Sequence, residues 1–272
     1  MPGLGPVLQQ GRQLLTAALI ARLRAAGCVF AEDEARLLLA AARSDADLEA
    51  YVRRREGGEP LEVILGWAEF CGLRVGVEPG VFVPRQRTAL LVDLAVAGLP
   101  SGPDRRPVVL DLCCGTGAMG LAVAARVPCR LLAADLDPVA VGCARRNLAD
   151  LGEVFEGDLF APVPRALLGR IDVVLANAPY VPTGEVGLMP PEAHEHEPRV
   201  ALDGGSDGLD VHRRIAADAP GWLAPGGRLL IEVAEPQVDE ALDLFEAADL
   251  EARVHRDQDR DAVAVVGTRR TR

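Results

Sequence analysis

Four consecutive residues, Asn177, Ala178, Pro179 and Tyr180, have the chemistry to hold a planar nitrogen group. They follow the apolar run 171–176, which predicts a buried strand. An Asn carboxamide accepts a hydrogen bond from an NH2 group and donates one to a carbonyl, while Pro stiffens the backbone so that nearby carbonyl groups keep their direction. A Tyr ring packs against a positively charged methyl donor. The set therefore fits methylation of an amide or amino nitrogen, although Asn and Pro are also common at ordinary strand ends.

A glycine-rich loop upstream predicts the methyl donor. Residues 108–120 read VVLDLCCGTGAMG, an apolar strand ending in Asp111, then a loop with Gly115, Thr116 and Gly117, then a helix of small residues. The glycines permit a tight turn and close approach of a ligand, and the helix start offers free N–H groups. A dinucleotide fold normally places the first Gly directly after the strand, whereas Asp111 precedes Gly115 by four residues. An acidic residue there repels a pyrophosphate but accepts from an ammonium group, so the loop favours S-adenosylmethionine over a nicotinamide dinucleotide.

Two further strand ends carry residues suited to the adenosine part of this cofactor. The strand expected at 130–135 ends in Asp135, where a carboxylate accepts hydrogen bonds from ribose hydroxyl groups, and Leu136 follows it. After a strand expected at 153–157, Asp158 is placed to accept from the adenine amino group and Leu159 to donate its backbone N–H. A solvent-exposed strand end and a plain turn are the alternatives for the two carboxylates.

The elements that must position these residues form two unequal parts joined by a linker. Helical spacing of Leu and Ala predicts helices over 7–26, 31–42, 47–55 and 60–65, so residues 1–63 are predicted to form a small helical domain. Alternating, glycine-punctuated residues 66–84 predict a β-hairpin within a linker at 64–88. Residues 89–272 then form the catalytic domain, which begins with a helix at 89–97 and a Pro/Gly-rich loop at 99–107.

Strands alternate with helical stretches over the rest of the chain. Strands are predicted at 108–112, 130–135, 153–157, 171–176, 227–233, 250–256 and 262–268. This pattern predicts an α/β fold with a doubly wound, mostly parallel seven-stranded sheet. Ligands bind such sheets at the carboxyl ends of the strands, where the glycine loop, Asp135 and Asn177 all fall. Residues 182–206 are predicted to be a long functional loop in which His194 and His196 are surface polar residues.

Composition agrees with a soluble enzyme. The 272 residues, 49% of them hydrophobic, suffice for one large core and a smaller domain. No apolar run approaches the ~20 residues that span a bilayer, and residues 1–30 lack a signal-peptide layout, so a cytoplasmic protein without a membrane partner is expected. The four His and six Cys show no metal-ligand spacing, and no metal site is predicted.

Charge argues against nucleic acid as a partner. The net charge is −11, and residues 76–272 carry 20 Arg against 30 acidic residues, which is unlike the basic footprint that phosphates require. All 29 basic residues are Arg. Bidentate contacts to phosphate or carboxylate groups would use Arg, but a chain so rich in Ala, Gly, Pro and Arg more simply reflects GC-rich coding.

Four stretches of the chain resemble the release-factor glutamine methyltransferases: residues 65–88, the DLCCGTGAMG loop, NAPY, and residues 197–215. The resemblance covers residues 60–268 and is weaker over the N-terminal helices. It implies a class I S-adenosylmethionine-dependent methyltransferase that modifies the side-chain amide nitrogen of a glutamine in a protein, with a release factor as a candidate substrate. It also implies that Asn177 and the Ala178 carbonyl orient the amide, that Tyr180 shapes the pocket, and that Phe82 and Pro84 wall the cofactor side.

The chain departs from this family in two places. The family motif reads N-P-P-Y, whereas this chain has Ala178, which keeps the main-chain carbonyl on a less rigid backbone. Where the family continues P-R-P-E-T-E, residues 84–89 read PRQRTA, which removes two acids and adds Arg87. The second departure changes the charge of the entrance and with it the choice of protein substrate, rather than the methyl transfer.

Other function classes stay open on the sequence alone. An amino-methyltransferase acting on a nucleobase uses the same Asn-X-Pro-Tyr chemistry, but it must hold the base with aromatic and basic groups, and aromatic residues make up only 4% of this chain. A small molecule or a different protein is an alternative acceptor, because the entrance is altered. A non-enzymatic binding module would keep the glycine loop but has no need of Asn177 and Tyr180.

Overall fold

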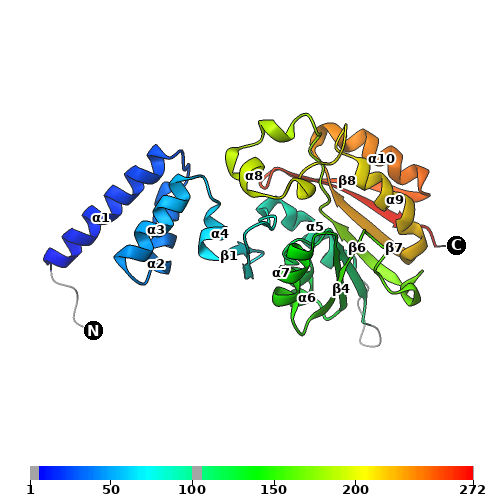
Figure 1. Cartoon of the computed structure of the whole chain (residues 1–272). Coiled ribbons are helices and arrows are strands. Elements are labelled where there is room, and N and C mark those ends of the chain that lie inside the picture. Colours follow the sequence, from blue (N-terminus) through cyan, green and yellow to red (C-terminus); the bar gives the residue numbers. More distant parts are fainter. Residues whose placement is uncertain (1–5, 100–105, 272) are drawn as a thin grey trace.

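The N-terminal part of the chain is a helical domain with its own core. The computed structural model describes residues 6–99 and 106–271, with the side chains of residues 6–12 excepted. The helices are α1 (Pro6–Ala25), α2 (Ala31–Ala41), α3 (Asp45–Glu56) and α4 (Leu61–Leu65), so their bounds differ by at most two residues from those predicted. Leu19, Leu23, Leu38 and Val52 pack together in the core of this domain. Figure 1 shows the domain to one side of the sheet, reached through α4 and β1.

A short hairpin follows the N-terminal helices. Strands β1 (Trp67–Phe70) and β2 (Leu73–Gly76) are antiparallel, and Cys71 and Gly72 make the turn with positive φ angles of 52° and 77°. The hairpin is therefore shorter than the predicted 66–84. The chain then turns at 78–81, where the Val81 backbone N–H donates to the Glu78 carbonyl at 3.2 Å, and Phe82 and Pro84 follow this turn beside the pocket described below.

A seven-stranded sheet forms the centre of the C-terminal part of the chain, with strand order β5-β4-β3-β6-β7-β9-β8. Neighbours from β5 to β7 are parallel, whereas β9 is antiparallel to both β7 and β8. The strands are β3 (Val108–Leu112), β4 (Arg130–Asp135), β5 (Gly152–Glu156), β6 (Ile171–Ala176), β7 (Leu223–Glu232), β8 (Leu250–Asp257) and β9 (Ala262–Arg269). The predicted fold class is confirmed, and the strand order reverses between β3 and β6, which is where such sheets bind ligands.

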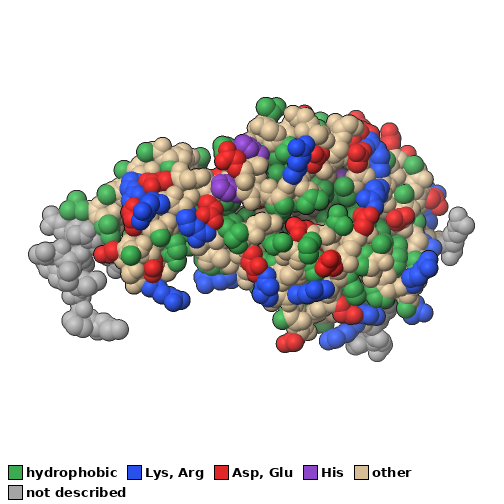
Figure 2. Space-filling model, viewed as in Figure 1, with side chains coloured by type: hydrophobic (Ala, Val, Ile, Leu, Met, Phe, Trp, Pro, Cys, Tyr) green, Lys and Arg blue, Asp and Glu red, His purple; other side chains and the backbone are tan. Residues whose placement is uncertain are grey.

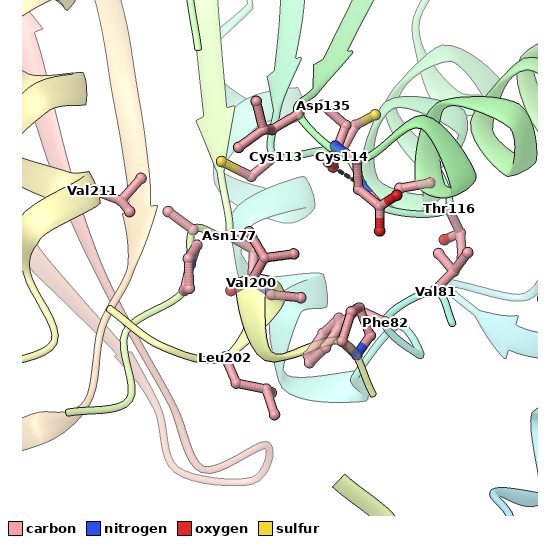
Figure 3. Close-up of a pocket in the computed structure, with 18 of the residues that line it drawn as sticks. Val81, Phe82, Cys113, Cys114, Thr116, Asp135, Asn177, Val200, Leu202 and Val211 are labelled. Carbon is pink, nitrogen blue, oxygen red and sulfur yellow. Dashed lines mark hydrogen bonds between the residues drawn. The ribbon is translucent and has the colours of Figure 1, made fainter. Parts of the chain in front are cut away.

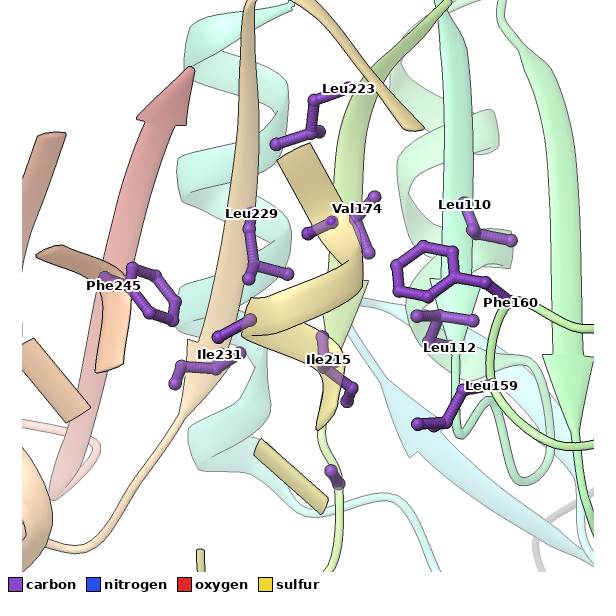
Figure 4. Close-up of a cluster of buried hydrophobic side chains, with 14 of the residues drawn as sticks. Leu110, Leu112, Leu159, Phe160, Val174, Ile215, Leu223, Leu229, Ile231 and Phe245 are labelled. Carbon is purple, nitrogen blue, oxygen red and sulfur yellow. The ribbon is translucent and has the colours of Figure 1, made fainter. Parts of the chain in front are cut away.

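Helices cover both faces of this sheet. Helices α5 (Ala89–Gly98), α6 (Ala118–Arg126) and α7 (Pro138–Leu148) pack on one face, and α9 (Asp210–Trp222) and α10 (Val238–Ala247) pack on the other. Figure 4 shows the second core, in which Ile215 and Phe245 face Leu229 and Ile231 of β7. Because both faces are covered, all six residues of β6 are buried. This explains the continuous apolar runs from which the strands were predicted.

The segment 182–206, predicted to be a long loop, contains regular secondary structure. It contains a short helix, α8 (Pro191–His196), and two turns of 3-10 helix, and a bridge between Val181 and Asp203 joins its ends. Arg55 of α3 contacts α8 through Glu192 at 2.5 Å, while it also pairs with the buried Glu34 of α2 at 2.7 Å. The helical domain is thereby tied to the segment that covers one side of the pocket.

Two further sequence predictions concern the loop before β3 and membrane-spanning helices. The predicted loop at 99–107 lies largely outside the described residues. Over the part of the chain that is described, no helix is both long enough and apolar enough to cross a membrane.

Candidate active site

A pocket opens at the carboxyl ends of β3, β4 and β6 (Figure 3). Its walls come from the linker, the glycine loop, the strand ends and the segment 182–206. The predicted site residues that line it are Phe82, Pro84, Gly115, Thr116, Asp135, Leu136, Asp158, Leu159, Asn177, Ala178, Pro179 and Tyr180. Two predicted residues, Asp111 and Gly117, do not line it.

The glycine loop joins β3 to α6 through a turn that requires unusual backbone angles. Gly115 and Gly117 have φ angles of 55° and 77°, which Gly adopts without strain. A Cβ atom at Gly117 would lie 3.1 Å from the Leu148 side chain, so this glycine serves packing against α7. A Cβ atom at Gly115 would meet no protein atom within 4 Å. Gly115 therefore leaves room for a ligand to approach the backbone.

Asp135, the last residue of β4, is fixed against this loop. Its Oδ2 accepts from the backbone N–H of Gly115 at 2.8 Å, and its Oδ1 accepts from the backbone N–H of Asp137 at 2.9 Å. Burial raises the pKa of the Asp135 carboxyl, which the two backbone hydrogen bonds partly oppose. Each carboxylate oxygen has a second lone pair, so Asp135 can still accept hydrogen bonds from the two hydroxyl groups of a ribose.

Asp111 does not occupy the position that the sequence suggested. Strand β3 continues through Leu112, and the Asp111 side chain is fully buried beneath the loop, where Oδ2 accepts from the Gly120 backbone N–H at 2.8 Å. Burial raises the pKa of this carboxyl to about 8. The expected contact with an ammonium group in the pocket is therefore not supported, because Asp111 instead faces the first turn of α6.

The predicted adenine side of the pocket combines apolar surface with one ion pair. Leu136 is 56% exposed at the rim. Leu159 has a φ angle of 47°, which is rare for a side chain other than Gly. Asp158 forms an ion pair with Arg214 at 2.5 Å. A carboxylate paired at the surface keeps lone pairs available to accept from an amino group.

The opposite side of the pocket is built on Asn177, the first residue after β6. Its Nδ2 donates a hydrogen bond of 3.1 Å to Oγ1 of Thr88, a hydroxyl group in a residue that is 3% exposed. Because this bond fixes the carboxamide, Oδ1 is the atom left to accept from an NH2 group in the pocket. Figure 3 shows Asn177 and Asp135 along the wall of the same pocket.

Tyr180 is held by two charged side chains. Its hydroxyl oxygen accepts from Arg87 Nη2 at 2.6 Å and donates to Glu232 Oε1 at 3.1 Å. Arg87 also pairs directly with Glu232 at 3.1 Å. Burial, together with the nearby Glu232 carboxylate, raises the pKa of the Tyr180 phenol far above its usual value. Tyr180 is thus neutral and its hydroxyl group is held in place, and both Tyr180 and Asn177 line the pocket.

The linker contributes Phe82 and Pro84 to the wall and is itself anchored by an ion pair. The Arg85 guanidinium lies 5.0 Å from the Phe82 ring centroid and donates to both carboxylate oxygens of Glu197 at 2.7 and 2.8 Å. Glu197 also accepts from the Val83 backbone N–H at 3.1 Å. These contacts join the linker to the segment 182–206 across the pocket.

The two His of the segment 182–206 lie in α8, outside the residues that line the pocket. In the described ranges, 6–99 and 106–271, no group of three or more His, Cys, Asp or Glu side chains could hold a metal ion.

The pocket has what S-adenosylmethionine requires. Gly115 allows close approach, Asp135 offers a half-buried carboxylate that is already fixed, and Phe82, Leu136 and Leu159 provide apolar walls. The residues present therefore fit this cofactor.

Thr88 and Arg87, which line the pocket, were absent from the predicted site, and so was Glu232, which accepts from Tyr180 outside the lining. Thr88 and Arg87 stand in the PRQRTA stretch, which the family resemblance had marked only for its charge. Glu232 is the last residue of β7 and the next-to-last of the strand predicted at 227–233, and a carboxylate near a strand end is the signal that had identified Asp135.

Comparison with known proteins agrees with this geometry. The methyltransferase small domain family matches residues 73–189, which include the glycine loop and NAPY. A release factor glutamine methyltransferase of Geobacter sulfurreducens is 40% identical over 198 residues, covering 71% of this chain and 67% of that protein. A 4-amino-L-phenylalanine/4-methylamino-L-phenylalanine methyltransferase of Streptomyces pristinaespiralis is 40% identical over 202 residues, covering 72% of this chain and 68% of that protein.

The fold has relatives at lower identity. The crystal structure of a methyltransferase from Pyrococcus furiosus superposes with a TM-score of 0.55 at 15% identity, covering 73% of this chain and 90% of that chain. With this strand order, the glycine loop, NAPY and the identity to the Geobacter protein, the chain belongs to the release factor glutamine methyltransferase family of S-adenosylmethionine-dependent enzymes.

Proposed function

We propose that this protein transfers the methyl group of S-adenosylmethionine to the side-chain amide nitrogen of a glutamine in a protein substrate. The observation that carries the proposal is the Asn177 carboxamide, whose Nδ2 is bonded to Thr88 and whose Oδ1 is left for an NH2 group in the pocket. The name of the Geobacter relative supports glutamine as the acceptor.

The cofactor would lie along the strand ends. Asp135 would accept from the ribose hydroxyl groups, while Leu136, Asp158 and Leu159 would surround the adenine. Gly115 and Thr116 would lie against the amino-acid part, with Phe82 and Pro84 on the linker side. When bound, S-adenosylmethionine supplies a methyl carbon activated by the positive sulfonium.

The residues of NAPY would orient the acceptor for a direct displacement. Asn177 Oδ1 would accept a hydrogen bond from one amide N–H and the Ala178 carbonyl a hydrogen bond from the other, so that the nitrogen would present its face to the methyl carbon. In a direct displacement the amide nitrogen would take the methyl group that the cofactor supplies, and the sulfur would leave with the electron pair of its bond to that carbon. The nitrogen then loses a proton to water. Tyr180 is neutral and fully bonded, so catalysis rests on proximity and orientation rather than on a general base.

The altered entrance bears on which protein is modified. Gln86 and Arg87 stand in the linker, where the family motif has Pro and Glu, so the negative charge expected there is missing. Charge complementarity at a rim governs encounter rate and partner choice. A release factor is therefore one candidate among the proteins of the cytoplasm, where we infer that the enzyme works.

A second acceptor class is favoured by one comparison. The Streptomyces relative, whose name specifies an aromatic amine of a free amino acid, is as similar to this chain as the Geobacter protein, at 40% identity. An aromatic NH2 group is planar and could use the same Asn177 oxygen. A nucleobase amine would also fit this chemistry, but the acidic chain disfavours it.

The decisive experiment uses isotopically labelled S-adenosylmethionine with a lysate that is separated into proteins, nucleic acids and small molecules. A labelled peptide whose glutamine carries the added methyl group supports the proposal. Label confined to free amino acids would establish the second acceptor class instead, and label in nucleic acid would overturn both. The matched control is Asn177→Ala, which should remove the label while the protein still binds the cofactor.

A further inference from the structure

A buried carboxylate lies behind the acceptor side of the pocket. Glu232, the last residue of β7, is 3% exposed, and its Oε1 accepts from both Tyr180 and Arg87. Its Oε2 has no hydrogen-bond partner among the described residues. Its backbone carbonyl lies 3.1 Å from Nε2 of the buried His212 in α9, which fixes the strand end.

The three side chains of this cluster come from distant parts of the sequence. Arg87 belongs to the 3-10 turn Gln86–Thr88, directly before α5, and Tyr180 follows β6. The phenol uses its hydroxyl group both as acceptor, from Arg87 Nη2 at 2.6 Å, and as donor, to Glu232 at 3.1 Å. Together these two hydrogen bonds hold the phenol oxygen in place, and with it the end of the Tyr180 ring that lies farthest from the backbone.

The charges of the cluster depend on one another. An ionised carboxylate that is withdrawn from water needs a nearby cation, and Arg87 supplies it through Nε at 3.1 Å. The guanidinium carbon also lies 5.8 Å from the Tyr180 ring centroid, where a cation is attracted to the ring face. Without Arg87, the Glu232 charge would stand unpaired beside the acceptor pocket.

We propose that Arg87 and Glu232 are positioning residues for methyl transfer, which hold the Tyr180 ring against the acceptor nitrogen. This inference rests on the proposed function and adds to it a requirement at two residues outside NAPY. The neutral phenol shapes the pocket and does not take a proton. The pair therefore affects how the acceptor is placed, not how the cofactor is bound.

The first test follows the phenol itself. The chain has two Tyr, Tyr51 and Tyr180, so a Tyr51→Phe background leaves Tyr180 as the sole tyrosine. Alkaline titration of tyrosinate absorbance should show ionisation of Tyr180 at lower pH in Glu232→Gln than in the Tyr51→Phe parent, because the adjacent carboxylate disfavours the phenolate. The control is Glu235→Gln, at a surface residue paired with Arg256, which should leave the titration unchanged. If the titration in Glu232→Gln is unchanged, the Glu232 carboxylate does not act on the Tyr180 phenol, and the inference is overturned.

The second test separates positioning from binding. Glu232→Gln and Arg87→Met should each lower kcat about 10-fold to 100-fold, as expected for a misplaced acceptor, with the Kd of S-adenosylmethionine changed less than about twofold. The double variant, which carries no unpaired charge, should lose little more than either single variant. Equal kcat in all variants, or parallel loss of cofactor affinity, would overturn the inference. If the wild type methylates no glutamine peptide, the proposed function fails instead, and the titration still reports on the cluster.

Discussion

At the scale of single residues, two carboxylates on neighbouring strands have different roles. Asp135 lines the pocket and accepts from the Gly115 backbone N–H, whereas Asp111 is buried outside the pocket and accepts from the Gly120 backbone N–H of α6. Asp135 is the last residue of β4, and Asp111 is the next-to-last residue of β3. The two carboxylates differ in the direction in which their side chains leave the sheet. That direction determines which of the two can bind a cofactor.

Changing Asp135 to Asn should weaken S-adenosylmethionine binding by about 1–3 kcal/mol, because hydrogen bonds from ribose to a charged acceptor would become neutral ones. Calorimetry of the purified protein measures this directly. Asp150→Asn, an exposed residue before β5, is the control and should bind normally. Unaltered affinity in Asp135→Asn would mean that the ribose lies elsewhere.

Changing Thr88 to Val should release the Asn177 carboxamide while keeping the volume of the buried side chain. We expect kcat to fall about 10-fold with little change in the Kd of the cofactor, since orientation of the acceptor is what is lost. Asn177→Ala should reduce kcat more than Thr88→Val does, because it removes the acceptor oxygen itself. Equal losses of turnover and cofactor affinity in Asn177→Ala would make Asn177 a structural residue.

The sequence could identify residues of the site that belong to local patterns. Asp135 and Asn177 were predicted because each stands at the carboxyl end of an apolar strand, in a sheet whose ligands bind at strand ends. The cluster of Arg87, Tyr180 and Glu232 could not be predicted, because it depends on contacts between three separate elements. The wrong assignment of Asp111 arose because its side-chain direction depends on packing under α6.

At the scale of elements, the segment 182–206 connects the two parts of the molecule. Glu192 of α8 pairs with Arg55 of the helical domain, and Glu197 pairs with Arg85 of the linker. The buried strands were predictable from continuous apolar runs, but α8 was not, since its sequence PEAHEH is short and polar and has no periodic apolar face. Contacts with neighbouring elements stabilise it instead.

Changing Arg55 to Met should therefore have a larger effect than changing Glu192 to Gln. Arg55→Met leaves the buried Glu34 without its cation, at a cost of about 3–5 kcal/mol. Glu192 is half exposed, so Glu192→Gln should cost ~0–1 kcal/mol of stability but increase hydrogen exchange in α8. Glu195→Gln, on the same helix, is the control. Equal exchange in the Glu192 and Glu195 variants would show that Arg55 does not hold α8.

At the scale of the whole molecule, Asp111 should make stability depend on pH. Its carboxyl has a pKa of about 8 when folded, against an ordinary value of 3.8. Between these values the folded chain keeps a proton that the unfolded chain releases, so stability is greatest below the lower value and falls as pH rises toward 8.

Asp111→Asn, which has no charge to desolvate, should flatten this dependence and raise the free energy of unfolding at pH 8 by roughly 1 kcal/mol or more. Urea titrations of both proteins at pH 5 and pH 8 measure it, within the range where Asp111 changes charge. The same pH dependence in both proteins would mean that Asp111 is ionised throughout.

The position of β9 has a consequence for how the site forms during synthesis. This strand lies between β7 and β8, and Ala264 of β9 pairs with Glu232 of β7. While the chain is growing, β7 must keep an open edge until β8 and β9 have both emerged, because β8 cannot take the place beside it. A nascent chain that already contains the glycine loop and NAPY would thus bind its cofactor before it could align an acceptor. Activity would appear late and abruptly, when β9 pairs with β7 and β8 and takes its interior position in the sheet.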